Sequence, residues 1–501
     1  MSETTGSRPS PDAAAGSFRS GAGALDGSTP PPAHPTVFEA QDVGEDYDLA
    51  SAPRHLDDAP GLAPRGRRPM RQVLLGDYSR LHEIVSRWYL VLTLLARLPS
   101  IILPLTVLTY VAVASGSELW GAVCAACVHL GQALSVLVLT RGNRIRLRQW
   151  VLLLHTAVHV GVICVLVYRL AEQARTAPEA AWPWHLALLA GLCAPQLGNA
   201  TRLRWRAILE THRRTDLIQP SMRHDAVMDA LALVLGALIT GVVAITVGPL
   251  VGIMASAGLL VVSSTALLLH PTAGFQARVA LRDPAETRPR LNTAMRRRRR
   301  MQRFVRLLPV LGGCCIGILL GSIQVGLVYF AASVDAVESI GAQFAGLGLM
   351  SGLAAMIAAG FVPRRPWNLW IIFGAATVIA TMLMSVPSRP LGMVLMLAVV
   401  GAAMGPTLIA VFGVVPLITP LADAAAISSA TTVLIQAGMA LGVVAAGVTG
   451  HRAGYETAVL LPVIASTLLL ITGLVFTQRR RRVALELPRY DTMLRTGPTP
   501  D

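Results

Sequence analysis

The feature that most constrains this chain is a series of long apolar runs. The hydrocarbon core of a bilayer is about 30 Å thick, and a helix crosses it with about 20 predominantly apolar residues. The alternating pattern of a transmembrane barrel is absent, and membrane bundles tolerate the Gly and Pro residues that interrupt several runs. The sequence therefore predicts an all-α polytopic membrane protein with 12 transmembrane helices. The runs lie near residues 88–114, 119–139, 149–170, 183–201, 226–247, 250–269, 305–333, 339–361, 367–386, 389–418, 424–450 and 455–477.

The composition agrees with a membrane protein. Hydrophobic residues make up 53% of the 501 residues and charged residues only 14%, against about 25% charged residues in a typical soluble protein. In a soluble protein, the net charge of +15 would suggest nucleic acid as a partner. Here the positive charges, all of them arginine, lie in short clusters between the apolar runs, as in the stretch from Arg141 to Arg148. We therefore expect no nucleic-acid partner.

The distribution of arginine predicts the orientation of the helices. With the N-terminus in the cytoplasm, successive inner connections carry four, six, eleven and two arginines. The outer connections carry only Arg169, Arg175, Arg389 and Arg452, together with several acidic residues. This asymmetry follows the positive-inside rule. It predicts that both termini are cytoplasmic and that the stretch around Arg144 is a cytoplasmic loop.

Polar segments divide the chain into five parts. The N-terminal segment is rich in Gly, Ala, Ser, Pro and Asp and has no apolar period, which indicates disorder. It also lacks the apolar core of a signal peptide. The arginine runs at 296–300 and 479–482 are expected to contact anionic lipids, worth about 1 kcal/mol per residue near the surface. The five parts are a disordered cytoplasmic tail (1–85), a six-helix bundle (86–270), a basic cytoplasmic linker (271–304), a second six-helix bundle (305–478) and a cytoplasmic tail (479–501).

The two bundles are predicted to be repeats of one another. The stretch APQL at 194–197 in the fourth run resembles GPTL at 405–408 in the tenth, at the same ordinal position in each half. Both termini and the central linker are expected on the same side of the membrane. This arrangement fits two parallel repeats related by an axis along the membrane normal, in which substrate sites form between the halves near the midplane.

Three short motifs carry a resemblance to a known family. They are LARLPS at 95–100 in the first helix, GQAL at 131–134 in the second and RLRW at 202–205 after the fourth. Together with the layout of six plus six helices, they resemble the major facilitator superfamily of transporters, in particular efflux-type permeases of actinobacteria. The resemblance covers about residues 88–478. It implies two pseudo-symmetric halves, a small-molecule substrate, coupling to protons and a monomer in the bacterial cytoplasmic (inner) membrane.

The chain departs from two motifs of this superfamily. The loop between helices two and three usually carries Gly-x-x-x-Asp-Arg-x-Gly-x-Arg, whose aspartate bonds across the cytoplasmic face. Aligned without gaps, the aspartate position falls on Arg144, and no acidic residue occurs between Gly131 and Val158. Helix five lacks the proline of the antiporter motif, although small residues between Gly236 and Gly241 still permit close packing. These losses leave open a transport-inactive relative that acts as a membrane scaffold or sensor.

Polar residues inside the apolar runs are candidates for function, because ionisable groups are costly in hydrocarbon. Arg97 lies in the first helix, which lines the central cavity of the resembled superfamily. It either binds an anionic group there or packs near the inner interface with its charge reaching the headgroups. Gln196 and Asn199 in helix four and Gln324 in helix seven are candidates for substrate contacts, with buried packing hydrogen bonds as the alternative.

Asp225 and Asp229 are four residues apart, so they share one face at the predicted start of helix five. They are interpreted mainly as a helix cap that pairs with Arg204 or Arg206 at the cytoplasmic surface. Proton coupling by Asp229 is the alternative. Asp423 begins helix eleven and is expected to pair with Arg141 or Arg144 in the loop between helices two and three. The candidates for a cytoplasmic gate are Arg141, Arg144, Arg204, Asp225 and Asp423.

Histidine titrates near neutral pH. His129 lies in the middle of helix two and is a candidate for proton coupling. His155 and His159 share a helix face, but the glutamate of a zinc-protease helix is missing, so no metal site is expected. The six cysteines, Cys124 and Cys127 among them, lie inside apolar runs and are interpreted as packing residues.

Motifs of common enzymes do not occur in the sequence: there is no P-loop, no dinucleotide-binding fingerprint and no nucleophile elbow. We therefore expect neither an enzyme nor a cofactor, and we do not expect ATP to be the energy source. The sequence favours a secondary transporter that exports a small organic compound by alternating access, with protons as the coupling ion. Uptake of a nutrient by the same fold is the alternative.

Overall fold

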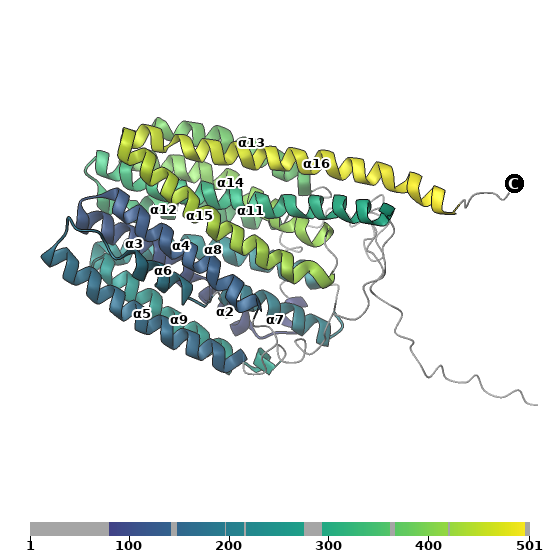
Figure 1. Ribbon diagram of the computed structural model, residues 1–501, viewed down its shortest axis with the longest axis horizontal. Helices are drawn as coiled ribbons and strands as arrows, with labels where there is room; N and C mark the ends of the chain where they lie inside the picture. Colours follow the sequence, from purple (N-terminus) through teal and green to yellow (C-terminus); the bar gives the residue numbers. More distant parts are fainter. Residues whose placement is uncertain are drawn as a thin grey trace, which may run out of the picture. The chain divides into compact units, whose positions relative to one another are not determined.

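The computed structural model describes residues 80–141, 148–195, 197–214, 217–274, 293–360, 366–418 and 421–495 (Figure 1). Regular structure within these ranges is helical, with no strand. Short 3-10 turns accompany the helices at Pro271–Gly274, Val337–Ser339 and Leu383–Ser385. The helices are α2 (Arg87–Leu95), α3 (Leu98–Ser115), α4 (Glu118–Arg141), α5 (Arg148–Thr176), α6 (Trp184–Leu192), α7 (Leu197–Thr211), α8 (Ile218–Thr246), α9 (Pro249–Leu269), α11 (Thr293–Ser333), α12 (Ile340–Gly360), α13 (Pro366–Met382), α14 (Pro390–Ile418), α15 (Leu421–Ala458) and α16 (Leu460–Arg495).

Ten stretches of the described chain are long and apolar enough to cross a membrane. Each coincides with a predicted run, so the all-α polytopic class is confirmed. The predicted fourth and fifth runs fall in α6, α7 and α8, where a break and charged residues shorten the apolar stretch. The count of 12 therefore stays a prediction. The ten stretches are Arg87–Ser115, Glu118–Leu137, Val151–Thr176, Pro249–Leu269, Gln302–Ser333, Ile340–Ala358, Trp367–Ser385, Pro390–Val414, Ser429–Ala458 and Leu460–Arg481.

The first predicted helix is divided into α2 and α3 at Ala96 and Arg97. Pro99 lies in the first turn of α3, where its missing N–H costs no hydrogen bond because the first amides of a helix have no intrahelical partner. The start of α2 is capped by the side chain of Ser86, which accepts a hydrogen bond from the amide of Tyr89. The break places Arg97 between two helices instead of inside one.

The fourth and fifth predicted helices also differ from the expected bounds. α6 ends at Leu192 shortly before Pro195, and α7 then runs from Leu197 to Thr211. The RLRW motif that was expected after helix four therefore lies inside α7. α8 begins at Ile218 instead of near residue 226. Asp225 and Asp229 consequently lie within the helix, so their interpretation as a cap at its start is wrong.

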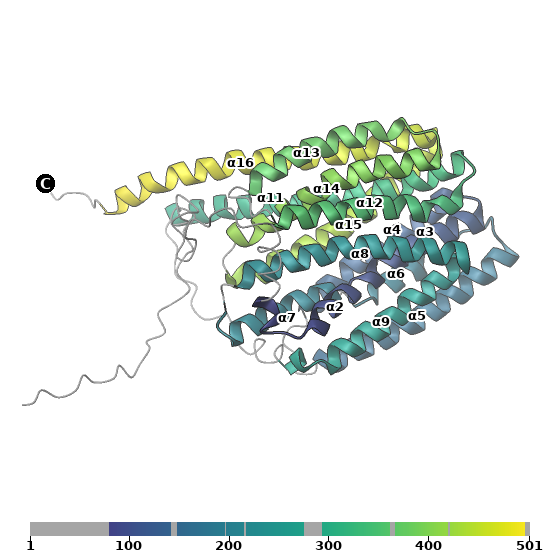
Figure 2. The ribbon, with the colours of Figure 1, turned by 180° about the vertical axis from the view of Figure 1, so that it is seen from behind.

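We divide the helices by chain order into a first group, α2 to α9, and a second group, α11 to α16. In the first group, α4 packs on α3 and α6, and α9 packs on α3 and α5. In the second, α11 packs on α15 and α16, while α14 packs on α12 and α13. Figures 1 and 2 show α5 beside α9 and α13 beside α16. Between the groups, α4 contacts α15 and α8 contacts α12, and a buried apolar cluster that includes Ala125, Val325 and Val443 joins them.

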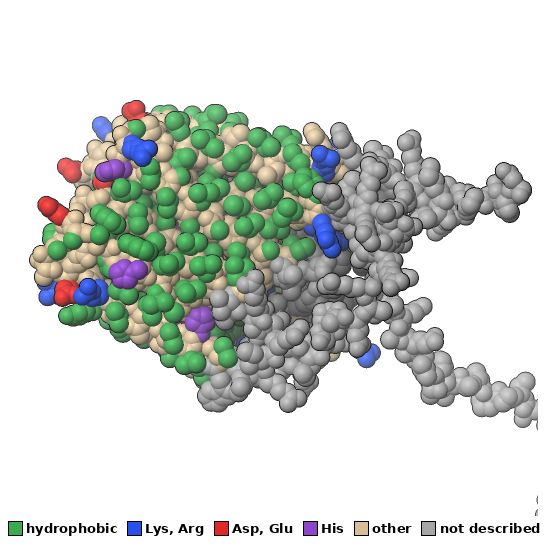
Figure 3. All heavy atoms as spheres, viewed as in Figure 1, with side chains coloured by type: hydrophobic (Ala, Val, Ile, Leu, Met, Phe, Trp, Pro, Cys, Tyr) green, Lys and Arg blue, Asp and Glu red, His purple; other side chains and the backbone are tan. Residues whose placement is uncertain are grey.

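Apolar side chains form a belt across the middle of the face seen in Figure 3. Leu154, Ile372, Ile379 and Leu395 are among the large hydrophobic residues that face outward. Soluble proteins rarely expose apolar surface of this extent, so the belt is suited to contact lipid. Acidic side chains gather at the end of the bundle opposite to that where α16 ends (Figure 3). We call these two ends the α16 end and the opposite end.

Candidate functional site

Arg97 lies at the centre of a buried charged cluster. Its side chain is only 4% exposed, and each nitrogen has a partner. Nη2 donates to Oδ1 of Asp225 at 2.7 Å, and Nε donates to Oδ1 of Asp229 at 2.5 Å. Nη1 donates to the carbonyl oxygen of Thr93 at 2.5 Å and to Oγ1 of Thr201 at 3.2 Å. This geometry excludes the interpretation in which the Arg97 charge reaches the headgroups.

Arg202 completes the charged cluster. It lies in α7 and forms an ion pair with Oδ2 of Asp229. Its Nη1 donates to Oγ1 of Thr432 in α15 at 2.9 Å, and its guanidinium carbon lies 5.9 Å from the ring centre of Phe412 in α14. Arg202 therefore connects the first group of helices to the second. Arg202 was not among the predicted site residues, because it was expected in a loop after helix four.

The cluster balances its charges. Two guanidinium groups, Arg97 and Arg202, face two carboxylates, Asp225 and Asp229. A charge buried in a protein is costly unless an opposite charge and hydrogen bonds compensate it. The ion pairs described for both carboxylates come from these two arginines. Arg204, which was expected to pair with them, donates to the carbonyl oxygen of Leu267 at 2.7 Å.

A second polar cluster lies between the two groups of helices. Nδ1 of His129 in α4 is 2.9 Å from Oε1 of Gln436 in α15, and Nε2 is 3.3 Å from Oε1 of Gln324 in α11. The structure thus brings together a predicted proton-coupling candidate and a predicted substrate contact. Gln436 was not among the predicted site residues, although it is a glutamine inside an apolar run, as Gln324 is.

The two polar clusters are neighbours in space. Thr432, which binds Arg202, and Gln436, which contacts His129, are four residues apart in α15 and so lie on the same helix face. On the first group, Nε2 of Gln132 donates to the carbonyl oxygen of Ser100 at 3.2 Å, and the Ser100 hydroxyl donates to the carbonyl oxygen of Arg97 at 2.8 Å. The two clusters therefore lie along one face of α15, and polar contacts continue from Arg97 to Gln132 within the first group.

We expect the substitution His129→Leu to lower the free energy of unfolding by about 1 to 3 kcal/mol, because the amide groups of buried Gln324 and half-buried Gln436 lose their partner. Thermal or denaturant unfolding of the purified protein measures the effect. His185→Leu is the matched control, since His185 is exposed in α6. Equal stabilities of the two variants would show that the His129 contacts contribute nothing.

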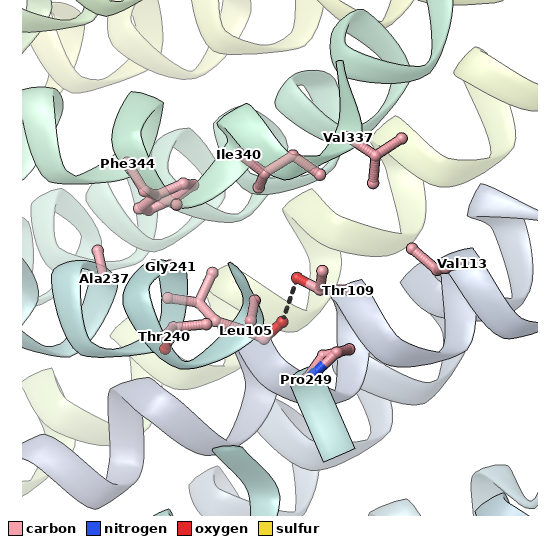
Figure 4. A pocket seen from close by; sticks show the side chains of 12 residues that line it. Leu105, Thr109, Val113, Ala237, Thr240, Gly241, Pro249, Val337, Ile340 and Phe344 are labelled. Atoms are coloured by element: carbon pink, nitrogen blue, oxygen red, sulfur yellow. Dashed lines mark hydrogen bonds between the residues drawn. The ribbon is translucent and has the colours of Figure 1, made fainter. Parts of the chain in front are cut away.

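A small cavity lies between the groups (Figure 4). Its lining residues lie near the ends of α3 and α8 and the start of α12, toward the opposite end. The cavity has a volume of about 120 Å³ and is lined by residues of α3, α8 and α12, including Leu105, Val113 and Phe344. The hydroxyls of Thr109 and Thr240 donate to carbonyl oxygens of their own helices at 2.8 Å. The lining is therefore apolar in character, and α8 and α12 meet beside it at Gly241 and Gly341.

The remaining predicted residues are placed as follows. Nδ1 of His159 is 3.0 Å from the carbonyl oxygen of Ala190, and Nε2 of His155 is 3.4 Å from that of Leu192, so both histidines hold α5 against α6. Several candidates lie outside the described residues or have side chains outside them, and their predicted roles stay predictions. These are Gln196, Asn199, Arg141, Arg144 and Asp423.

Comparisons with known proteins identify the fold. No family model and no curated protein matches the sequence. Solved structures do match. The human organic anion transporter MFSD10 (TETRAN) is 15% identical, with a TM-score of 0.51 over 82% of this chain and 100% of that one. A mutant of the nucleoside transporter NupG is also 15% identical, with a TM-score of 0.54 over 78% of this chain and 99% of that one.

Both matched structures are transporters of the major facilitator superfamily. The matches cover nearly the full length of both structures. This confirms the resemblance at the level of the fold. The ten apolar stretches agree with it and indicate an integral multi-pass membrane protein. The chain therefore has the fold of the major facilitator superfamily.

Proposed function

We propose that this protein is a secondary active transporter that moves a small organic compound across the membrane by alternating access. The observation that carries the proposal is the position of the charged cluster. Asp229 and Arg202 belong to the first group of helices, and Arg202 binds Thr432 in the second. In a fold whose two halves move against each other around a site between them, such a contact has to form and break during the cycle.

We further propose that the transport is proton-coupled export, with both termini in the cytoplasm of a bacterium. Arginine lies mainly in the connections predicted to be inside. His129 contacts Gln436 across the boundary between the halves. Asp229 pairs with Arg202, which in turn donates to Thr432 of the other half, so a change of protonation at either residue would alter contacts across the boundary. Anionic lipids at the cytoplasmic face and a monomeric state complete the proposal.

A transport-inactive membrane scaffold or sensor is the second candidate function. It is favoured by one feature of the sequence, the lack of any acidic residue between Gly131 and Val158. A superfamily gate that depends on an aspartate there would not close. Arg144→Asp tests this explanation, because an increase in flux would indicate that the wild-type gate is impaired.

Reconstitution of the purified protein in liposomes tests the proposed transport. We expect a pH gradient to drive flux of at least one compound in a screen, and Asp229→Asn to abolish that dependence on the gradient. Arg169→Gln is the control, since Arg169 pairs with Glu172 on the exposed surface. Flux in the direction of uptake would show that the protein imports a nutrient and would contradict the proposed export. Full gradient-driven flux in Asp229→Asn would show that Asp229 takes no part in proton coupling.

A further inference from the structure

The two acidic side chains of the charged cluster have unequal surroundings. The side chain of Asp225 is 7% exposed and pairs with Arg97, which is 4% exposed. The side chains of Asp229 and Arg202 are 30% and 18% exposed. Arg97 and Asp225 therefore belong to the packed interior, whereas Asp229 and Arg202 form the pair that a ligand can reach.

Asp229 can leave Arg202 without losing its charge compensation. Its Oδ1 accepts a hydrogen bond from Nε of Arg97 at 2.5 Å, while Oδ2 binds Arg202. The two oxygens thus have different arginine partners. A small rotation of the carboxylate breaks the bond to Arg202 and leaves the bond to Arg97 in place.

Once Asp229 has left Arg202, the guanidinium of Arg202 requires another anion as its partner. A guanidinium in a largely desolvated position is costly without an opposite charge. Its planar fork of N–H groups fits a carboxylate through two parallel hydrogen bonds. The ring of Phe412 lies beside the guanidinium, 5.9 Å from its carbon, and offers a surface for an apolar body attached to that carboxylate.

We propose that Arg202 binds the carboxylate of an organic anion, which takes the place of Asp229 on this guanidinium. The proposal rests on the proposed function and names the class of its substrate: an organic carboxylate with an apolar or aromatic body. In the absence of substrate, Asp229 is the internal substitute for that carboxylate. The bound anion lies where Arg202 meets Thr432 and Phe412, so it contacts both groups of helices.

Benzoate is a suitable probe, with benzamide as its uncharged counterpart. The thermal unfolding of the purified full chain in lipid nanodiscs is followed while each compound is added at constant ionic strength. We expect benzoate, but not benzamide, to raise the unfolding temperature of the wild type in a saturable manner. In Asp229→Asn the competing charge is gone, so benzoate should bind about tenfold more tightly.

Variants of the guanidinium test the site directly. Arg202→Gln should lose the benzoate effect, and Arg202→Lys should keep a weakened one because the charge remains without the fork. Arg169→Gln on the exposed surface should behave as the wild type. The proposal is wrong if Arg202→Gln keeps the full benzoate effect, or if Asp229→Asn binds benzoate no more tightly than the wild type. The comparison of benzoate binding by Asp229→Asn and by the wild type tests the proposal even if Arg202→Gln does not fold.

The binding assay separates this proposal from the proposed transport, because it requires neither a gradient nor a sealed vesicle. Benzoate binding that depends on Arg202, without flux of any compound of the liposome screen, would reject transport and retain the anion site. Gradient-driven flux of uncharged compounds that persists in Arg202→Gln, without benzoate binding by the wild type, would reject the anion site and retain transport.

Discussion

Replacing Arg97 by glutamine is expected to lower the free energy of unfolding by about 3 to 5 kcal/mol, the usual cost of removing one partner from a buried ion pair. Asp225 is 7% exposed, and the substitution removes the guanidinium that lies 2.7 Å from its carboxylate. Asp229 loses one of its two arginine partners as well. Unfolding of the purified variant in mixed micelles, compared with the wild type, measures the loss.

A paired substitution distinguishes lost charge compensation from lost packing. Arg97→Met combined with Asp225→Leu removes both charges of the buried pair, and such replacements are often neutral or stabilising. We expect this double variant to recover most of the stability lost in Arg97→Gln. Arg169→Gln, in an exposed pair with Glu172, should change stability by no more than about 1 kcal/mol. An Arg97→Gln variant as stable as Arg169→Gln would show that the cluster does not stabilise the fold.

Gly241→Leu is expected to stop the proposed transport cycle by keeping the opposite end open. α8 and α12 touch there through their backbones, and a Cβ at position 241 would lie 2.9 Å from the carbonyl carbon of Gly341. Backbone atoms cannot move aside as a flexible side chain can, so the two helices have to separate. Liposome flux measures the loss of transport. The labelling rate of Ile340→Cys by an impermeant maleimide, which should rise severalfold in the Gly241→Leu background, measures the opening.

The matched control for this substitution is Gly161→Leu in α5. A Cβ at Gly161 meets no heavy atom within 4 Å, so the same increase in side-chain volume should leave both flux and labelling unchanged. Unaltered labelling of Ile340→Cys in the Gly241→Leu background would mean that the contact between α8 and α12 does not close this end of the protein.

The long apolar runs gave the most accurate predictions of the helices. In the described part of the chain, all ten stretches suited to cross a membrane coincide with predicted runs, because a hydrocarbon environment requires about 20 consecutive apolar residues with internally satisfied backbones. The predicted fourth and fifth runs were less accurate. A hydropathy pattern does not show whether a helix continues past polar residues. The tertiary structure buries a charge in each of these helices, Arg204 in α7 and Asp225 in α8.

The candidate site was predicted in part. Arg97, Asp225, Asp229, His129 and Gln324 were each selected as polar residues in or beside an apolar run, and the structure brings them into two adjacent clusters. Their partners Arg202, Thr432 and Gln436 were not selected. A single threonine or glutamine in an apolar helix is common, and only its neighbours show that it faces another polar group.

The sequence by itself determined that this chain is a bundle of membrane helices, because the cost of exposing backbone polar groups to lipid leaves few other structures for long apolar runs. Only the tertiary structure decided which charges compensate each other. Arg97 is separated from Asp229 by 132 positions and from Asp225 by 128. Ion pairs over such separations depend on how the helices break, cross and pack, and local sequence carries no information on that arrangement.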